Sequence, residues 1–215
     1  MDRALQVVLP AHCVGCGAVG TYLGDVCAAA AERPANLEYV GGERSYGTLA
    51  ASFAYRGVAR TAALRLKYAN LHAIAPAMAS PMAKVLPWHS PFDLLVPVPL
   101  DPSRLRGRGF NQTALLAKGV ARRIDVPFDG SVLHRVAHGL AQVGSTPPDR
   151  RDNVENAFGT RHCERIAGLT VLIDDDDVTT GRTMESSASV LRSSGAETVQ
   201  ALCFARRTAP NLTAD

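Results

Sequence analysis

From residue 92 onward, short apolar runs alternate with longer amphipathic stretches, and this alternation limits the possible folds more than any other feature of the sequence. The apolar runs have the length of buried strands and lie at residues 92–100, 131–136, 156–160, 169–174 and 198–206. Segments 111–124 and 183–195 have helical spacing, with Asn111 as the expected N-cap of the first and Gly195 ending the second. The pattern predicts an α/β fold with a central, mostly parallel sheet flanked by helices on both faces.

The part of the chain before residue 92 is less regular. Residues 45–70 predict a strand or two followed by a helix that carries Lys67. Residues 72–91 are helical in composition, and we expect that helix to be broken by its prolines, Pro76, Pro81 and Pro87.

The first 35 residues differ from the rest, because they are rich in glycine and hold the cysteines Cys13, Cys16 and Cys27 without helical or strand periodicity. We expect residues 1–35 to form a small cysteine knuckle and residues 36–215 to form the α/β domain. Cys163 and Cys203 are scattered and suit buried apolar positions.

Composition excludes several classes of protein. The 215 residues are 47% hydrophobic and 20% charged, as in a globular protein with a core. A net charge of +3 is weak support for binding polyanions. The sequence has no apolar stretch long enough to span a membrane, and its N-terminus lacks the features of a signal peptide. Five unevenly spaced cysteines do not make a disulfide framework, so we expect a cytoplasmic protein.

The segment TVLIDDDDVTTGRT places four aspartates, 174–177, directly after a buried strand. Ligands of parallel sheets bind at the carboxyl ends of the strands. In the loop 179–183 that follows, Gly181 allows a tight turn, while threonine hydroxyls and the amides of the next helix favour a phosphate. Carboxylates that can bind hydroxyl groups, next to a loop that can bind a phosphate, indicate a sugar phosphate as the ligand. The alternative is a solvated strand-to-helix turn with an N-cap.

The same segment resembles the phosphoribosyl pyrophosphate (PRPP) motif of type I phosphoribosyltransferases. In that motif an acidic pair, here Asp175 and Asp176, precedes a Thr-Gly-x-Thr turn. Asp174 and Asp177 stand where the motif has apolar residues. The pieces DLLVPVPL, RGRGFNQTALLA and RRDNVENAF, with the cysteine knuckle, extend the resemblance over nearly the whole chain to the ComF/GntX family. The implied fold is the type I phosphoribosyltransferase fold.

The resemblance assigns roles to three groups of residues. Asp175 and Asp176 are the catalytic acids that hold the ribose hydroxyls. The remaining PRPP-binding positions are Thr179, Thr180, Gly181, Arg182 and Thr183. The pyrophosphate loop contributes Pro97, Val98, Pro99, Arg104, Arg106 and Arg108. Because these arginines recur at every second position, an extended segment would present them on one side. A merely solvated basic loop and a nucleic-acid patch stay open as alternatives.

A flexible loop is also implied, at residues 139–153, with family positions at Gln142, Arg150, Arg151 and Asn153. A loop of this length is either functional or disordered. Lys67 lies in a segment, LRLKYAN, similar to one in which the family has a lysine before an aromatic residue. The alternative for Lys67 is a surface lysine on a helix.

The cysteine segment corresponds to a four-cysteine zinc ribbon in the family, but Ala30 stands where the fourth cysteine belongs. Residues 1–35 are therefore a degenerate, zinc-ribbon-like knuckle, with Cys13, Cys16 and Cys27 as the zinc ligands that remain.

Two functions follow from the resemblance. In the first, the chain is a phosphoribosyltransferase that binds PRPP with Mg²⁺ and transfers ribose 5-phosphate to an unknown acceptor. In the second, it is a non-catalytic ComF-type module of DNA uptake in natural transformation that binds single-stranded DNA or a helicase partner. A homo-oligomer is possible under either.

Overall fold

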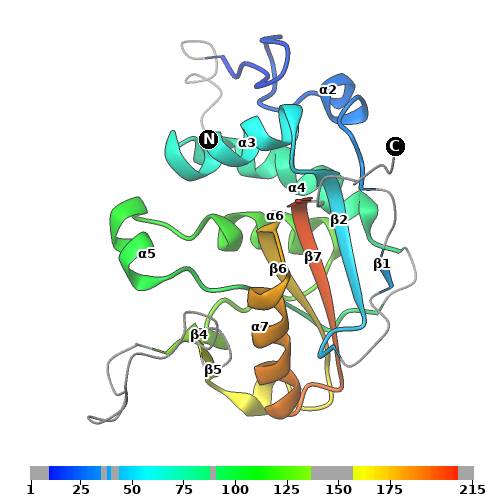
Figure 1. The fold of residues 1–215 in the computed structure, drawn as a ribbon, viewed down its shortest axis with the longest axis vertical. Coiled ribbons are helices and arrows are strands. Elements are labelled where there is room, and N and C mark those ends of the chain that lie inside the picture. Colours follow the sequence, from blue (N-terminus) through cyan, green and yellow to red (C-terminus); the bar gives the residue numbers. More distant parts are fainter. Residues whose placement is uncertain (1–9, 35–37, 40–43, 88–90, 137–156, 208–215) are drawn as a thin grey trace, which may run out of the picture.

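The computed structural model describes residues 10–34, 38–39, 44–87, 91–136 and 157–207 (Figure 1). Its centre is a five-stranded sheet in the order β1-β2-β7-β6-β3. The strands are β1 (Glu38–Tyr39), β2 (Thr48–Ala54), β3 (Leu94–Pro97), β6 (Thr170–Val178) and β7 (Thr198–Arg206). Every pairing is parallel except that of β1 with β2. The predicted α/β class with a mostly parallel sheet is therefore confirmed.

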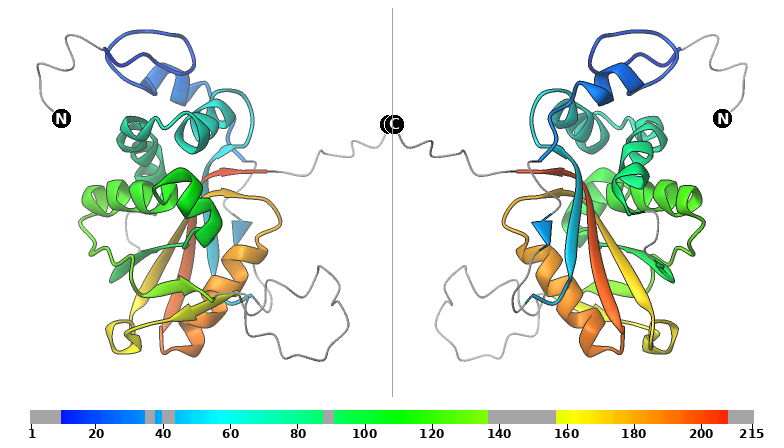
Figure 2. Two further views of the ribbon diagram at one scale, coloured as in Figure 1. Left: turned by 90° about the vertical axis from the view of Figure 1, so that its left-hand side faces the viewer. Right: turned by 90° about the vertical axis from the view of Figure 1, so that its right-hand side faces the viewer.

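Helices cover both faces of this sheet, as Figure 2 shows. The α-helices of the described residues are α2 (Asp25–Ala29), α3 (Gly57–Tyr68), α4 (Ala75–Val85), α5 (Pro102–Arg108), α6 (Gln112–Ile124) and α7 (Arg182–Ser193). Side chains of α3, α4 and α6 form one hydrophobic core with the sheet, and those of α7 form the other. Strand β6 contributes Leu172 to the first core and Ile173 to the second, as the alternation of side chains in a strand requires.

Two predicted strands lie outside the central sheet. The runs at 131–136 and 156–160 form β4 (Leu133–Arg135) and β5 (Phe158–Thr160), which pair antiparallel in a separate two-stranded sheet. Leu133 and Phe158 pack into the core on the α7 side, so the pair covers that face of the sheet beside α7. Apolar character predicted these strands, but it could not predict their partners.

The prediction that prolines break the helix of residues 72–91 is wrong at Pro81. A short 3-10 turn, His72–Ile74, leads into α4, which continues through Pro81 to Val85. Pro76 lies in the first turn, where no amide hydrogen is needed. Pro81 is buried beside Met78 and Met82, and this burial offsets the hydrogen bond that the ring removes.

Predicted helix ends agree well with the structure. Asn111 caps α6, and its side chain accepts a hydrogen bond from the amide of Thr113 at 3.1 Å.

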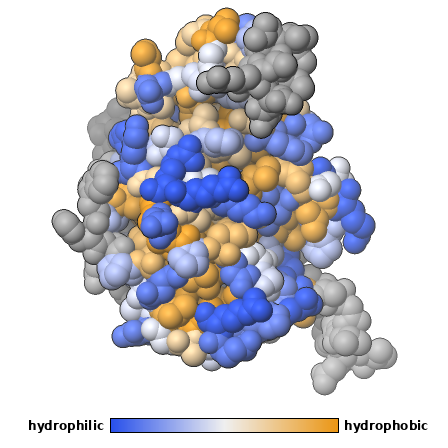
Figure 3. Space-filling model, turned by 180° about the vertical axis from the view of Figure 1, so that it is seen from behind, coloured by the Kyte–Doolittle hydropathy of each residue, from blue (hydrophilic) through white to orange (hydrophobic). Residues whose placement is uncertain are grey.

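On the face opposite to that of Figure 1, hydrophilic and hydrophobic residues are interspersed (Figure 3). Within the described part of the chain, no helix is both long and apolar enough to cross a membrane.

Candidate functional site

The carboxyl ends of β3 and β6 meet at one edge of the sheet, where Pro97 pairs with Asp174. After β3 the chain enters α5 and α6, and α6 lies on one face; after β6 it enters α7 on the other face. Neighbouring strands whose helices leave in opposite directions form a topological switch point, the usual place for a ligand in such sheets. A cavity of about 260 Å³ lies here, lined by residues of both strand ends.

The four aspartates lie within β6, because the strand continues to Val178 and does not end at residue 174 as expected. It stays paired with β7 as far as Val178 opposite Arg206. Asp174 and Asp176 are buried, whereas Asp175 and Asp177 are partly accessible. The cavity is lined by Asp175, Asp176 and Asp177, but not by Asp174.

Lys67 is the direct counter-ion of the acidic run. Its ammonium reaches from α3 to the carboxylates of Asp176 and Asp177. The Lys67 side chain is only 11% exposed, which rules out the surface-lysine alternative. Burial alone would lower the pKa of Lys67, but the two carboxylates outweigh it and raise that pKa. Lys67 therefore stays charged in the site.

Two residues that the sequence analysis did not single out bind the acids from α6. Gln112 is buried and donates to Oδ1 of Asp176 at 3.0 Å, and the Thr113 hydroxyl lies 3.4 Å from Oδ1 of Asp175. Both stand in the quoted segment RGRGFNQTALLA, immediately after the N-cap Asn111. Their position in the first turn of a helix that starts beside the sheet edge was the signal that could have identified them.

Burial disfavours the charged form of the inner acids. It raises the pKa of Asp174 well above the ordinary value, and the nearby carboxylates of Asp175 and Asp176 add to the shift. Burial likewise raises the pKa of Asp175, with a contribution from Asp176. Asp177 differs: burial opposes its ionisation, but Lys67 and Arg207 hold its pKa below the usual range. Burial therefore favours the neutral form of Asp174 and Asp175, whereas Lys67 and Arg207 favour the ionised form of Asp177.

The pyrophosphate loop is partly helical, which corrects the expected extended geometry. Asp101 caps α5 by accepting from the amide of Ser103 at 2.9 Å, and Gly109 ends the helix in a left-handed conformation. Residues four apart share a helix face, and Arg104 and Arg108 both line the cavity, whereas Arg106 does not. The three arginines therefore do not act from one side.

The basic wall of the cavity has two further members, Arg135 and Arg207. Arg135 lies on β4, where its Nε donates to the carbonyl of Pro99 at 3.2 Å and its guanidinium lies 4.7 Å from the centre of the Phe158 ring. Arg207 follows β7, and its Nε lies 3.4 Å from Oδ2 of Asp177. Pro99 and Val98 also line the cavity, whereas Pro97 lies one residue earlier, in β3.

The predicted phosphate loop lies next to the acids. A small hollow is lined by Asp175, Asp177 and all of residues 178–184. Gly181 precedes α7 with φ of 78°, and no described side chain caps that helix. A Cβ at Gly181 would lie 3.1 Å from both the Arg44 Nη1 and the Tyr46 hydroxyl. The turn therefore requires glycine and leaves the first amides of α7 available to a ligand.

The individual residues of this loop differ in exposure. Thr179, Thr180 and Arg182 are exposed, and Thr183 is half-buried and lines both the hollow and the larger cavity. The flexible-loop residues Gln142, Arg150, Arg151 and Asn153 lie outside the described residues.

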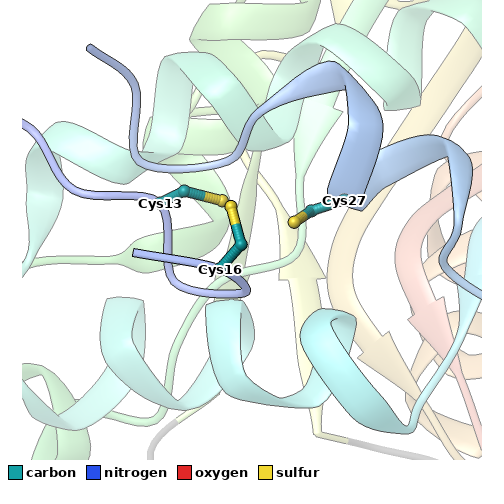
Figure 4. Close-up of side chains that lie close together, drawn as sticks. All are labelled: Cys13, Cys16 and Cys27. Atoms are coloured by element: carbon teal, nitrogen blue, oxygen red, sulfur yellow. The ribbon is translucent and has the colours of Figure 1, made fainter. Parts of the chain in front are cut away.

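The cysteine knuckle brings its three predicted ligands together. The Sγ atoms of Cys13, Cys16 and Cys27 lie within 4.8 Å of one another, and Figure 4 shows them converging from a turn and from α2. The three thiols can thus serve one metal ion. Cys163 is exposed and Cys203 is buried, so the expectation of a buried position is wrong for Cys163.

A parallel sheet with acids, an open helix start and arginines at one switch point agrees with the phosphoribosyltransferase fold that the resemblance implied. The family model described as "Phosphoribosyl transferase domain" matches residues 112–213. The chain is also 35% identical over 115 residues to Competence protein F of Haemophilus influenzae and 38% identical over 114 residues to DNA utilization protein YhgH of Salmonella typhi. These matches confirm the resemblance to the ComF family.

The matches to the two relatives cover 53% of this chain and 50% and 49% of the relatives, so the chain spans about half the length of each. Among solved structures, the allosteric regulatory enzyme of purine biosynthesis is similar at 18% identity and a TM-score of 0.44, over 61% of this chain and 25% of that one. Glutamine PRPP amidotransferase from B. subtilis is similar at 18% identity and a TM-score of 0.43, over 60% of this chain and 26% of that one.

Proposed function

We propose that this protein binds PRPP at the switch point between β3 and β6. The observation that carries the proposal is the shared location of the acidic run and the uncapped start of α7, which together line one hollow. Carboxylates that accept hydrogen bonds from hydroxyl groups, next to free amides that bind a phosphate, match a phosphorylated pentose.

Each part of PRPP has a counterpart in the site. Asp175 and Asp176 would hold the ribose hydroxyls, and the turn 179–183 would hold the 5-phosphate. Arg104 and Arg108 would bind the pyrophosphate, because guanidinium groups suit phosphate oxygens. Arg135 lines the same cavity and adds a third guanidinium.

The carboxylate oxygens of Asp175, Asp176 and Asp177 are also of the kind that Mg²⁺ prefers, so these residues would hold the ion with the ligand. Bound Mg²⁺ would neutralise part of the charge of the pyrophosphate. The Lys67 ammonium already neutralises part of the acidic run, so Mg²⁺ must be accommodated beside it or in its place.

If transfer occurs, the bond from C1 of the ribose to the pyrophosphate oxygen breaks, and pyrophosphate leaves with the electron pair. A lone pair of the acceptor forms the new bond to C1, and the acceptor loses a proton to solvent. The chain would contribute by positioning the reactants and stabilising the leaving charge with arginines.

Free thiols on all five cysteines suit a reducing compartment such as the cytoplasm.

Isothermal titration of PRPP into the protein, with and without Mg²⁺, tests the proposal. We expect 1:1 binding that strengthens with Mg²⁺. Ribose 5-phosphate and pyrophosphate should each bind more weakly and compete with PRPP. An absence of heat at millimolar PRPP in the presence of Mg²⁺ would count against the proposed site.

The second candidate is a module that binds single-stranded DNA or a helicase partner, and two observations favour it. The matched relatives carry names that refer to competence and DNA utilization, and Arg104 and Arg106 are exposed on α5. A gel shift with single-stranded DNA over a salt series tests this function. Binding through phosphates must weaken steeply as salt increases.

A further inference from the structure

The cysteine cluster has the features of a built site. Cys13 and Cys16 lie in a turn, and Cys27 approaches them from α2 (Figure 4). The amide of Gly24 donates to the Cys13 Sγ at 3.4 Å. A Cβ at Gly15 would lie 2.8 Å from the Cys27 Sγ, so only glycine fits beside that sulfur. In a tetrahedral zinc site with Zn–S bonds of about 2.3 Å the sulfurs are roughly 3.8 Å apart, which is compatible with this cluster.

The cluster supplies three ligands, whereas a closed structural zinc site has four. Among the described residues, no histidine, aspartate or glutamate joins it. His12 is adjacent in sequence, but its Nδ1 lies 3.1 Å from the carbonyl oxygen of Gly17. Glu32 is ion-paired with Arg56 at 3.2 Å. Neither His12 nor Glu32 has a ligand atom within the cluster of the three sulfurs.

Residue 30 is the position from which a fourth ligand would come. It follows Cys27 at the same spacing that separates Cys13 from Cys16, and this residue is alanine. Ala30 and Cys27 line one open hollow of about 450 Å³, together with Gly15, Ala31 and Val58. The missing side chain thus leaves space beside Cys27, and this space is open to solvent.

We propose that Cys13, Cys16 and Cys27 form a metal site with one open coordination position, and that a low-molecular-weight thiol occupies this position as a fourth ligand. Three sulfur ligands favour a fourth soft donor. The hollow beside Cys27 is larger than a water molecule needs. Ala30, Ala31 and Val58 give it an apolar side that suits the carbon chain of a small thiol, and Glu32 and Arg56 give it a charged side that suits the polar end. The incoming thiol binds as thiolate and releases its proton to solvent.

Titration of the full-length, reduced protein with Co²⁺ under anaerobic conditions tests the proposal, because the visible absorption of Co²⁺ reports the number and type of its ligands. We expect one Co²⁺ per chain, and we expect added 2-mercaptoethanol to change the spectrum to that of a site with four sulfurs. The variant Ala30→Cys should give the four-sulfur spectrum without added thiol. It should also bind Zn²⁺ about tenfold more tightly than the wild type, measured by competition with a zinc indicator.

Two variants complete the design. Cys27→Ser should weaken Co²⁺ binding and abolish the response to thiol, whereas Cys163→Ser, which changes an exposed cysteine outside the cluster, should behave as the wild type. The proposal is overturned if the wild type binds no Co²⁺. It is equally overturned if thiol leaves the wild-type spectrum unchanged, because the site would then be closed by another group.

Discussion

Lys67 and Asp176 form an ion pair across the floor of the cavity, although they belong to α3 and β6 and are far apart in the sequence. Their side chains are 11% and 5% exposed, so little water screens the pair. Gln112 binds the other oxygen of Asp176 at 3.0 Å. The fold therefore contains its own cation at the point where the proposed ligand would bring Mg²⁺.

The first prediction concerns this internal cation. Lys67→Met keeps most of the apolar stem and removes the ammonium, which leaves Asp176 and Asp177 without their main counter-ion. We expect a loss of about 3 kcal/mol in the free energy of unfolding, and we expect millimolar Mg²⁺ to restore part of it. Urea denaturation with and without Mg²⁺ measures both effects.

Lys84→Met is the matched control for this change, because Lys84 is exposed at the end of α4. That variant and the wild type should show little response to Mg²⁺. If Lys67→Met is as stable as the wild type, Lys67 does not neutralise the acids.

The second prediction concerns pH. Burial, with the carboxylates of Asp175 and Asp176, raises the pKa of Asp174 well above its ordinary value, and both oxygens of Asp174 lack hydrogen-bond partners within the described structure. The unfolded chain ionises this group near pH 3.9. Between the two pKa values the native state binds the extra proton, so the contribution of Asp174 to stability falls as pH rises.

Asp174→Val should therefore stabilise the protein by about 1–3 kcal/mol near neutral pH, with a smaller gain as pH approaches 4. Chemical denaturation of both proteins at several pH values measures the difference. PRPP affinity should be unchanged, because Asp174 does not line the cavity. A gain that is independent of pH would show that Asp174 is ionised in the native state.

The third prediction separates the arginines of α5. Arg104→Ala and Arg108→Ala should each weaken pyrophosphate binding about tenfold, as expected for the loss of a charge-assisted hydrogen bond. Arg106→Ala is the control, since Arg106 lies on the same short helix but does not line the cavity. Equal losses in all three variants, measured by titration calorimetry, would indicate that the segment binds in an extended form.

The fourth prediction concerns the turn before α7. Gly181→Ala forces an alanine to a φ of 78° and brings its Cβ to 3.1 Å from Arg44 and Tyr46. We expect a loss of stability of about 1–2 kcal/mol and a larger loss of affinity for ribose 5-phosphate. Gly168→Ala is the control, because Gly168 has a φ of 74° with no atom near its Cβ position.

Gly168→Ala should thus carry the backbone cost of the left-handed conformation but leave binding unchanged. If both variants bind ribose 5-phosphate as the wild type does, the turn 179–183 does not hold the phosphate.

Local patterns in the sequence predicted much of the fold. The spacing of apolar residues predicted β6, β7, α6 and α7, because the residues that these elements bury recur at the period of a strand or of a helix. Asn111 and Gly195 marked the ends of helices through backbone chemistry that needs no tertiary context. The motif in β6 and the turn after it predicted the position of the candidate site.

Most errors came from long-range packing. Pro81 is tolerated because its neighbours in α4 are buried, and β4 and β5 pair with each other outside the central sheet. One error was local: the α5 helix was missed despite its cap at Asp101, because it has only seven residues and its arginines resemble a loop in composition. Contacts from Gln112 and Lys67 to Asp176 join distant elements, so spacing within one segment could not show them.

The most direct test is a PRPP titration, with Mg²⁺, of the double variant Asp175→Asn, Asp176→Asn beside the wild type. Asp177 keeps Lys67 paired in this variant, so the fold should survive, and circular dichroism checks that it does. We expect the wild type to bind PRPP and the folded variant not to bind it. Wild-type affinity in the folded double variant would contradict the assignment of these acids to the ribose.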